Sequence, residues 1–127
     1  MAVEQDYLVR AIKEMAKVIA KVVLKKTDTE YRVSEQAEST EDALYVQLMK
    51  MLDEGEVNEA ENLLFEELDG KDKNKLEVAL AFYTKLAEYE EDYLKEHNYS
   101  KEEVKNGLID IAKIYGVVNV INYLELD

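Results

Sequence analysis

The side chains that most often carry out chemistry are sparse in this 127-residue chain, which has one histidine and no cysteine. His97 lies beside Glu96 in a segment that is expected to end a helix. A catalytic base or metal ligand would need convergent partners, which the sequence around His97 does not mark. Because a cationic side chain is favourable near a helix C-terminus, we expect His97 to be a surface or capping residue.

Carboxylates are abundant and gather in two runs, EYEEDY at residues 88–93 and EELDGKD at residues 66–72. Such runs could bind a hard cation, but neither has the alternating ligands and central glycine of an EF-hand loop. Inward-facing Glu-x-x-His motifs and phosphate-binding or nucleophile motifs are also missing from the sequence. We therefore expect solvated helix surface, with no metal, no cofactor and no catalytic residues. A pair of carboxylates could still do acid–base catalysis, because spatial pairing leaves no mark in a sequence.

Tyrosine is unusually frequent, with nine in the chain. One interpretation places these rings at the edge of the core, with the apolar body inward and the hydroxyl outward. The other is a recognition surface, since tyrosine is favoured at interface hot spots. Gly107 lies inside a predicted helix, where it marks either a close helix approach or a tolerated cost of about 1 kcal/mol. Six tyrosines fall in the second half of the chain: Tyr83, Tyr89, Tyr93, Tyr99, Tyr115 and Tyr123.

The elements that must position these side chains are predicted to be helices. The chain has no proline, only four glycines, and many residues that favour helix. We predict an all-α fold of about six helices in a single domain over residues 1–127. The net charge of −13 argues against nucleic-acid binding, and no secretory signal or membrane-spanning segment is evident, so the default location is the cytoplasm.

Charge is distributed unevenly along the chain. Residues 1–26 carry a balance of +3 and residues 27–127 a balance of −16. Residues 4–26 are predicted to form one long amphipathic helix, whose apolar side chains fill an arc of about 160° opposite a basic arc of about 120°. A helix on a single core needs an apolar stripe of only about 100°, so this one is expected to contact two surfaces. Its predicted self-association face is Leu8, Ile12, Met15, Ile19 and Val22, spaced as a coiled-coil seam. Its basic side chains are Arg10, Lys13, Lys17, Lys21 and Lys25.

Three roles for this first helix stay open. It packs on its own domain alone; or it also packs on a second copy, giving a homodimer whose lysines lessen the repulsion between acidic bodies; or it lies on anionic lipid. The lipid role is disfavoured because the rest of the chain is acidic and Trp or Phe anchors are lacking in this helix. The width of the apolar arc favours the dimer.

Residues 27–39 read as a polar connection, and residues 40–127 as a body of helical hairpins. Gly55 and Gly70 are expected to end helices, as is Gly116. Ser100 and Glu103 have the spacing of a capping box. The tail after Gly116 suits either a strand or a short helix, and the lack of other predicted strands favours the helix.

The hairpin LYVQLMKMLDEGEVNEAENLLFE resembles a tetratricopeptide unit, with Leu44 and Met51 at large apolar positions, Gly55 at the turn and Ala60 at a small packing position. Leu48 and Glu67 replace residues that are small in that motif. The next hairpin follows after about 44 residues and not 34, which does not fit a repeat array. The resemblance implies antiparallel helix pairing without a repeat groove.

The stretches QDYLVRAIKEM, LDEGEVNEAENLLFEEL and EHNYSKEEVKNGLIDIAKIYG resemble a family of small acidic bacterial proteins of unknown function, found mainly in Firmicutes. That resemblance implies an all-helical fold and supplies no catalytic or binding residues. The functional hypothesis is a non-catalytic protein-interaction or scaffold module whose partner is a second copy or another protein. The alternatives are a small-molecule or metal-dependent enzyme with a hidden carboxylate site, and a peripheral membrane-surface protein.

Overall fold

The computed structural model describes residues 2–26, 29, 31 and 40–123, with only the backbone of residues 2–6. These residues form helices and their connections, as the all-α prediction required. The helices are α1 (Ala2–Ile19), continued by a π-helical turn η1 (Ala20–Leu24), α2 (Thr40–Asp53), α3 (Val57–Glu67), α4 (Lys73–Glu88), α5 (Glu91–Glu96), α6 (Lys101–Ile114) and α7 (Val118–Tyr123). No helix in the described part of the chain is long and apolar enough to cross a membrane.

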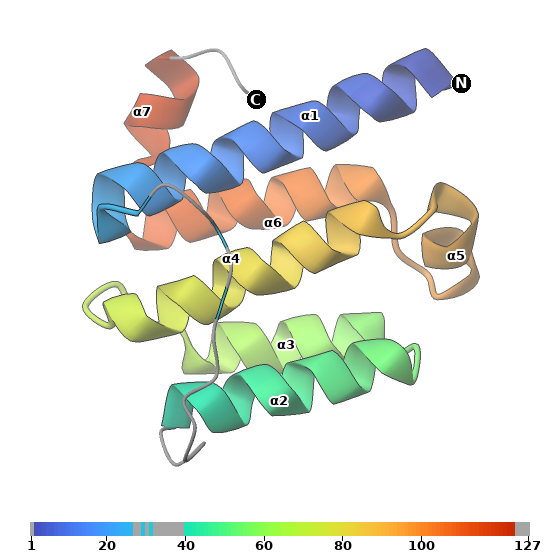
Figure 1. The fold of residues 1–127 in the computed structure, drawn as a ribbon, viewed down its shortest axis with the longest axis horizontal. Helices are drawn as coiled ribbons and strands as arrows, with labels where there is room; N and C mark the ends of the chain where they lie inside the picture. The colour runs from blue at the N-terminus through green and yellow to red at the C-terminus, as the bar shows by residue number, and fades with distance from the viewer. Residues whose placement is uncertain (1, 27–28, 30, 32–39, 124–127) are drawn as a thin grey trace.

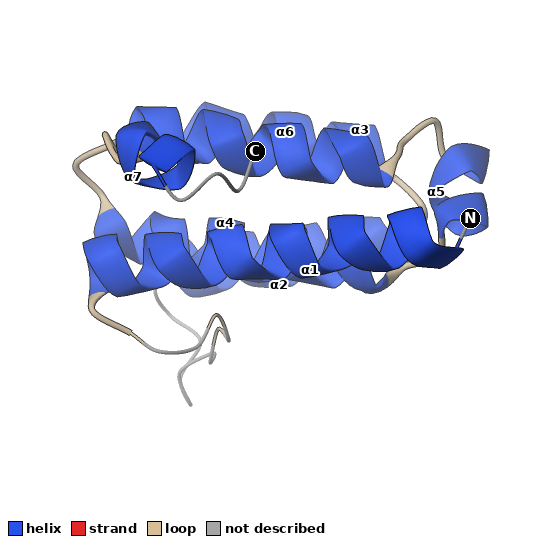
Figure 2. Ribbon diagram, turned by 90° about the horizontal axis from the view of Figure 1, so that it is seen from above, coloured by secondary structure: helices blue, strands red, loops and turns tan. Residues whose placement is uncertain are grey.

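The long helices run roughly parallel or antiparallel to one another and form two layers. Figure 2 shows α1, α4 and α2 in one layer, and α6 and α3 in the other. In Figure 1, α1 lies at one edge of this arrangement, and α2 and α3 lie at the opposite edge. Each layer buries its inner side against the other, which is how amphipathic helices remove their apolar stripes from water.

Helix α4 is the centre of the core, because it packs against α1, α2 and α6. Eight of its residues are buried, including Leu80, Phe82 and Leu86, which are at most 1% exposed. Its N-terminus is capped by Asp72, whose carboxylate accepts hydrogen bonds from the backbone amides of Asn74 and Lys75. These bonds satisfy amides that have no partner within the helix.

The first helix begins at Ala2 and its helical turns end at Leu24, which differs from the predicted span of residues 4–26. It ends because Lys25 adopts a left-handed conformation, with φ of 60°, so its amide donates back to the carbonyl of Ala20. The Lys26 ammonium then lies 2.8 Å from a carboxylate oxygen of Glu77 on α4. The wide π-helical turn and this ion pair fix the C-terminal end of the segment on α4.

The structure has more helices than the predicted six, because the chain breaks between α4 and α5. Tyr89 and Glu90 are extended, with ψ of 151° at both residues. Carboxylates are unfavourable in the last turn of a helix and favourable in the first turn. The break places Glu91 and Asp92 in the first turn of α5, where the helix dipole stabilises them. This division accounts for one helix beyond the predicted six.

Other local predictions are confirmed, except that α3 ends at Glu67 with an extended Leu68, before Gly70 is reached. Gly55 and Gly116 have positive φ angles of 79° and 76°, as residues that end helices often do. The Ser100 hydroxyl accepts from the backbone amide of Glu103 at 3.2 Å, so the N-terminus of α6 is capped as expected. The tail forms the short helix α7 rather than a strand. The predicted connection over residues 27–39 lies outside the described residues, except for positions 29 and 31.

Candidate functional site

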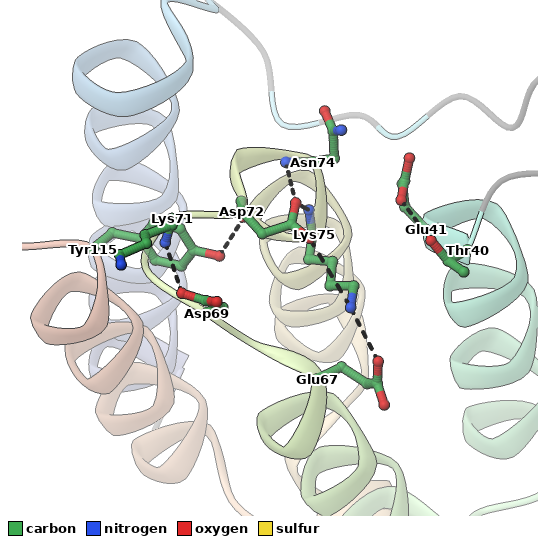
Figure 3. Close-up of polar contacts among 9 residues, drawn as sticks. All are labelled: Thr40, Glu41, Glu67, Asp69, Lys71, Asp72, Asn74, Lys75 and Tyr115. Atoms are coloured by element: carbon green, nitrogen blue, oxygen red, sulfur yellow. Dashed lines mark hydrogen bonds and ion pairs between the residues drawn. The ribbon is translucent and has the colours of Figure 1, made fainter.

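The EELDGKD run at residues 66–72 forms the turn between α3 and α4, where its charges stabilise local structure (Figure 3). The Lys75 ammonium lies 3.1 Å from a carboxylate oxygen of Glu67 and 4.0 Å from one of Asp72. The hydrogen bond with Glu67 is the main cause that raises the pKa of Lys75. Tyr115, the C-cap residue of α6, donates from its hydroxyl to the backbone carbonyl of Asp72 at 2.7 Å. The run therefore ties α3, α4 and α6 together.

The two tyrosine rings of the EYEEDY run at residues 88–93 form a series with His97, from the end of α4 along α5. The Lys85 ammonium lies 5.8 Å from the ring centroid of Tyr89, and the ring centroids of Tyr89 and Tyr93 are 4.8 Å apart. The centroids of Tyr93 and His97 are 4.3 Å apart. Each ring covers part of the next, so this surface of α5 is packed by its own side chains.

His97 occupies the C-terminal cap of α5, as predicted. Its Nδ1 atom lies 2.8 Å from the carbonyl oxygen of Tyr93. On its other side the ring packs against the turn between α2 and α3, where a Cβ on Gly55 would lie 2.6 Å from Nε2. His97 thus fills a gap between two turns, and its place in packing explains why the residue is there.

A cluster that the sequence did not predict lies between α3, α4 and the start of α6. The hydroxyls of Tyr83 and Tyr99 both donate to the same carboxylate oxygen of Glu61, at 2.5 Å and 2.7 Å. Burial is the largest cause that raises the pKa of both phenols well above the usual value, and the Glu61 carboxylate adds to it. The interpretation in which tyrosine hydroxyls point outward is wrong for these two residues, because both hydroxyls form hydrogen bonds with Glu61 inside the protein.

Gly107 is explained by the same cluster. A Cβ at this position would lie 2.4 Å from the hydroxyl oxygen of Tyr83, closer than atoms can approach without displacement. The hydroxyl cannot simply move away, because Glu61 holds it. Of the two interpretations of Gly107, close approach of α6 to a neighbouring helix is therefore the correct one.

A cavity of about 230 Å³ lies between α2 and α4 and is bordered by Thr29 and Tyr31 from the connection. The Tyr31 ring stacks on Tyr45, with centroids 4.7 Å apart, and its hydroxyl donates to Asp42. The Thr84 hydroxyl likewise donates to Thr29. Most polar groups of the wall thus have partners within the chain, which indicates a packing seam between the connection and the α2–α4 surface.

The structure divides the predicted self-association face. Ile12, Met15 and Ile19 are 0% exposed and pack into the core formed with α4 and α6. Leu8 is half-buried and Val22 is 38% exposed. A contact with a second copy through the three buried side chains would require α1 to leave its own core. The apolar arc of α1 is therefore buried mainly within the chain. It contacts two neighbouring helices, α4 and α6, which accounts for its width.

The opposite side of α1 carries a row of exposed cations, which we call the α1 stripe: Arg10, Lys13, Lys17 and Lys21. Steps of three and four residues place the four side chains on one helix face. Within the described part of the chain, none of them has an ion pair. Tyr7, which is 68% exposed, extends this surface toward the N-terminus. One exposed carboxylate, Glu14, lies among these cations on the same face, so the face is basic but not purely cationic.

Among the described residues, no group of three or more histidine, aspartate or glutamate side chains is placed to hold a metal ion. The sequence predicted the basic arc of α1 from residue spacing alone. The sequence could not predict that the apolar arc of α1 is buried against two helices of the same chain, because that depends on the positions of α4 and α6. The Glu61 cluster was missed because its three members come from separate segments.

Comparison with known proteins bears on family membership. The sequence model of a family of unknown function (DUF6483) matches residues 2–116, from the start of α1 to the end of α6. No curated protein and no solved structure matches the chain. The predicted resemblance to an uncharacterised family is therefore confirmed, and the chain belongs to this family of unknown function.

Proposed function

We propose that this chain is a non-catalytic protein-interaction module of the cytoplasm, and that the α1 stripe is its docking surface. The observation that carries the proposal is the row of four unpaired cations on an edge helix of a chain with a net charge of −13. In our proposal the tetratricopeptide-like hairpins serve as a rigid scaffold for that helix.

Electrostatics favours a partner for the stripe. The chain has twenty-nine acidic side chains, yet none pairs with Arg10, Lys13, Lys17 or Lys21 within the described residues. The exposed carboxylate of Glu14 lies on the same face, four residues after Arg10 and three before Lys17, so this face carries four cations and one carboxylate. A complementary acidic surface relieves the repulsion among the cations while it steers association. Exposed Tyr7 and Val22 near the two ends of the row add apolar contact, which single surface ion pairs need in order to give measurable affinity.

A protein partner fits this surface better than a membrane. An amphipathic helix binds lipid by inserting its apolar face. In α1 that face contains Ile12, Met15 and Ile19, which are fully buried in the chain's own core. Insertion into lipid would therefore require α1 to detach from α4 and α6. Without insertion, only the cations of α1 would attract anionic headgroups. The acidic side chains of the rest of the protein would be repelled by the same headgroups.

Site-specific photo-crosslinking in native cells tests the proposal. A photoreactive phenylalanine derivative replaces Tyr7, which is exposed and aromatic, and in a matched chain it replaces Val46, which is 53% exposed on α2. We expect protein adducts at position 7 that exceed those at position 46, and we expect Lys17→Glu to reduce them. Equal adducts at both positions, or none at position 7, would show that α1 is not the docking surface.

A further inference from the structure

We propose that the α1 stripe binds the outer face of α3 in a second copy of the same chain, so that subunits associate head to tail. The inference rests on the proposed function, because it assigns the partner of the docking surface proposed above. Its support is the match in charge, spacing and exposure between two helices of this chain.

The charged side chains on the outer face of α3 are all acidic, and the exposed side chain between Glu59 and Glu66 is the neutral Asn62. We define the α3 stripe as Glu59 and Glu66 on the helix, with Glu56 and Asp69 just beyond its ends, and all four are exposed. The helix itself contains no lysine or arginine. Within the described residues, Glu59 and Glu66 have no ion pair. The carboxylates are therefore as unpaired as the cations of the α1 stripe.

The spacing of the two stripes is the same. Glu59 and Glu66 are seven residues apart, which is two helical turns or about 10 Å along the axis. Arg10 and Lys17 are also seven residues apart, so their charges repeat at the same distance. Two helices packed side by side can then pair both cations with both carboxylates at once. The outer face of α3 carries no cation, whereas the outer side of α6 exposes Lys113 among its carboxylates.

The positions of the helices determine the geometry of assembly. Helix α1 and helix α3 lie in different layers and toward opposite edges of the molecule (Figures 1 and 2). A closed two-fold pair requires both stripes on one face, and this arrangement does not provide it. Each subunit instead offers its α1 to one neighbour and its α3 to another, which is a heterologous contact. Such a contact builds chains or rings whose size grows with protein concentration.

Charge reversal with cross-mixing tests the inference by sedimentation velocity on the full chain. Arg10→Glu/Lys17→Glu places carboxylates opposite Glu59 and Glu66, and Glu59→Lys/Glu66→Lys places ammonium groups opposite Arg10 and Lys17. We expect each variant alone to associate at least about tenfold more weakly than the wild-type chain, since attraction between two ion pairs becomes repulsion. An equimolar mixture of the two variants should regain association, because every contact between unlike variants is complementary. Circular dichroism verifies that each variant is folded.

The control is Lys73→Glu/Lys113→Glu, which changes the net charge as much as the α1 variant but at exposed lysines on α4 and α6. It should associate as the wild-type chain does. Raising the ionic strength to about 1 M, where the screening length falls to about 3 Å, should dissociate the wild-type assemblies.

Three results would overturn the inference. A wild-type chain that stays monomeric at high concentration and low salt, while position 7 still crosslinks to other proteins, contradicts self-association and leaves the proposed function standing. Association that survives reversal of Glu59 and Glu66 rules out α3 as the partner surface. Failure of the mixture to associate, when both variants are folded, shows that the two stripes do not meet.

Discussion

The Glu61 cluster makes the protein sensitive to alkaline pH, with a magnitude that follows from its burial. Burial raises the pKa of Tyr83 and of Tyr99 above the ordinary phenol value of about 10. In the unfolded chain both phenols have this ordinary pKa. Because the folded-state pKa is raised, the stabilisation is complete below pH about 10 and is lost as the pH rises further. One unit above that value, each buried phenol favours unfolding by about 1.4 kcal/mol.

The two phenols together therefore cost about 3 kcal/mol at pH about 11, a large part of the 5–15 kcal/mol that is typical of a small domain. Urea unfolding at pH about 8 and about 11 measures the loss, and comparison with Tyr83→Phe isolates one phenol from every other group that titrates. At pH about 8 we expect this variant to be less stable by about 2 kcal/mol, since Glu61 loses a hydrogen bond. At pH about 11 the difference should shrink by about 1.4 kcal/mol.

Tyr7→Phe is the matched control, because Tyr7 is 68% exposed and its removal should leave the pH dependence unchanged. Ultraviolet absorbance of tyrosinate follows the same groups in the native chain. The reasoning is refuted if all nine tyrosines ionise near pH 10 while the protein is still folded. It is equally refuted if the stability difference between wild type and Tyr83→Phe is the same at both pH values.

Three further predictions follow from packing and capping, each measured by thermal or urea unfolding. Gly107→Ala should destabilise the fold by about 1–2 kcal/mol, because overpacking against the Tyr83 hydroxyl outweighs the gain in helix propensity, and a stabilised variant would contradict the contact. Ile12→Ala should cost about 3 kcal/mol and Lys13→Ala less than about 0.5 kcal/mol, and similar effects at both positions would contradict the orientation of α1. Asp72→Ala should cost about 1 kcal/mol through loss of the α4 cap, and no effect would show that other groups satisfy the two amides.

Much of the secondary structure could be predicted because its signals are local. Gly55 and Gly116 predicted the C-terminal ends of two helices, and both have positive φ. Ser100 predicted the start of α6, and apolar spacing predicted the short C-terminal helix. The division of α4 from α5 was missed, although the carboxylates at positions 90–92 carry the signal for it. Carboxylates occur both on solvated helix faces and in the first turn of a helix, so this run alone does not distinguish the two arrangements.

Side-chain placement across helices was harder to predict. The wide apolar arc of α1 indicated two contact surfaces, and a second copy was the favoured explanation for the second surface. The structure supplies both surfaces from one chain, α4 and α6, and a hydrophobic pattern does not distinguish these cases. The role of Glu61 could not be predicted for a related reason, since a half-buried carboxylate and an exposed one look alike in the sequence of an acidic helix until Tyr83 and Tyr99 are placed beside it.

The central claim is that α1 is held by its apolar side in its own core and engages partners through its basic outer side. A dilution series of amide chemical shifts, recorded by nuclear magnetic resonance on the isotope-labelled chain, tests it most directly. We predict concentration-dependent shifts that cluster at Arg10, Lys13, Lys17 and Lys21 and between Glu56 and Asp69, while amides elsewhere stay constant. Shifts centred on another helix, or spectra that do not change with concentration in low salt, would contradict head-to-tail association through these two stripes.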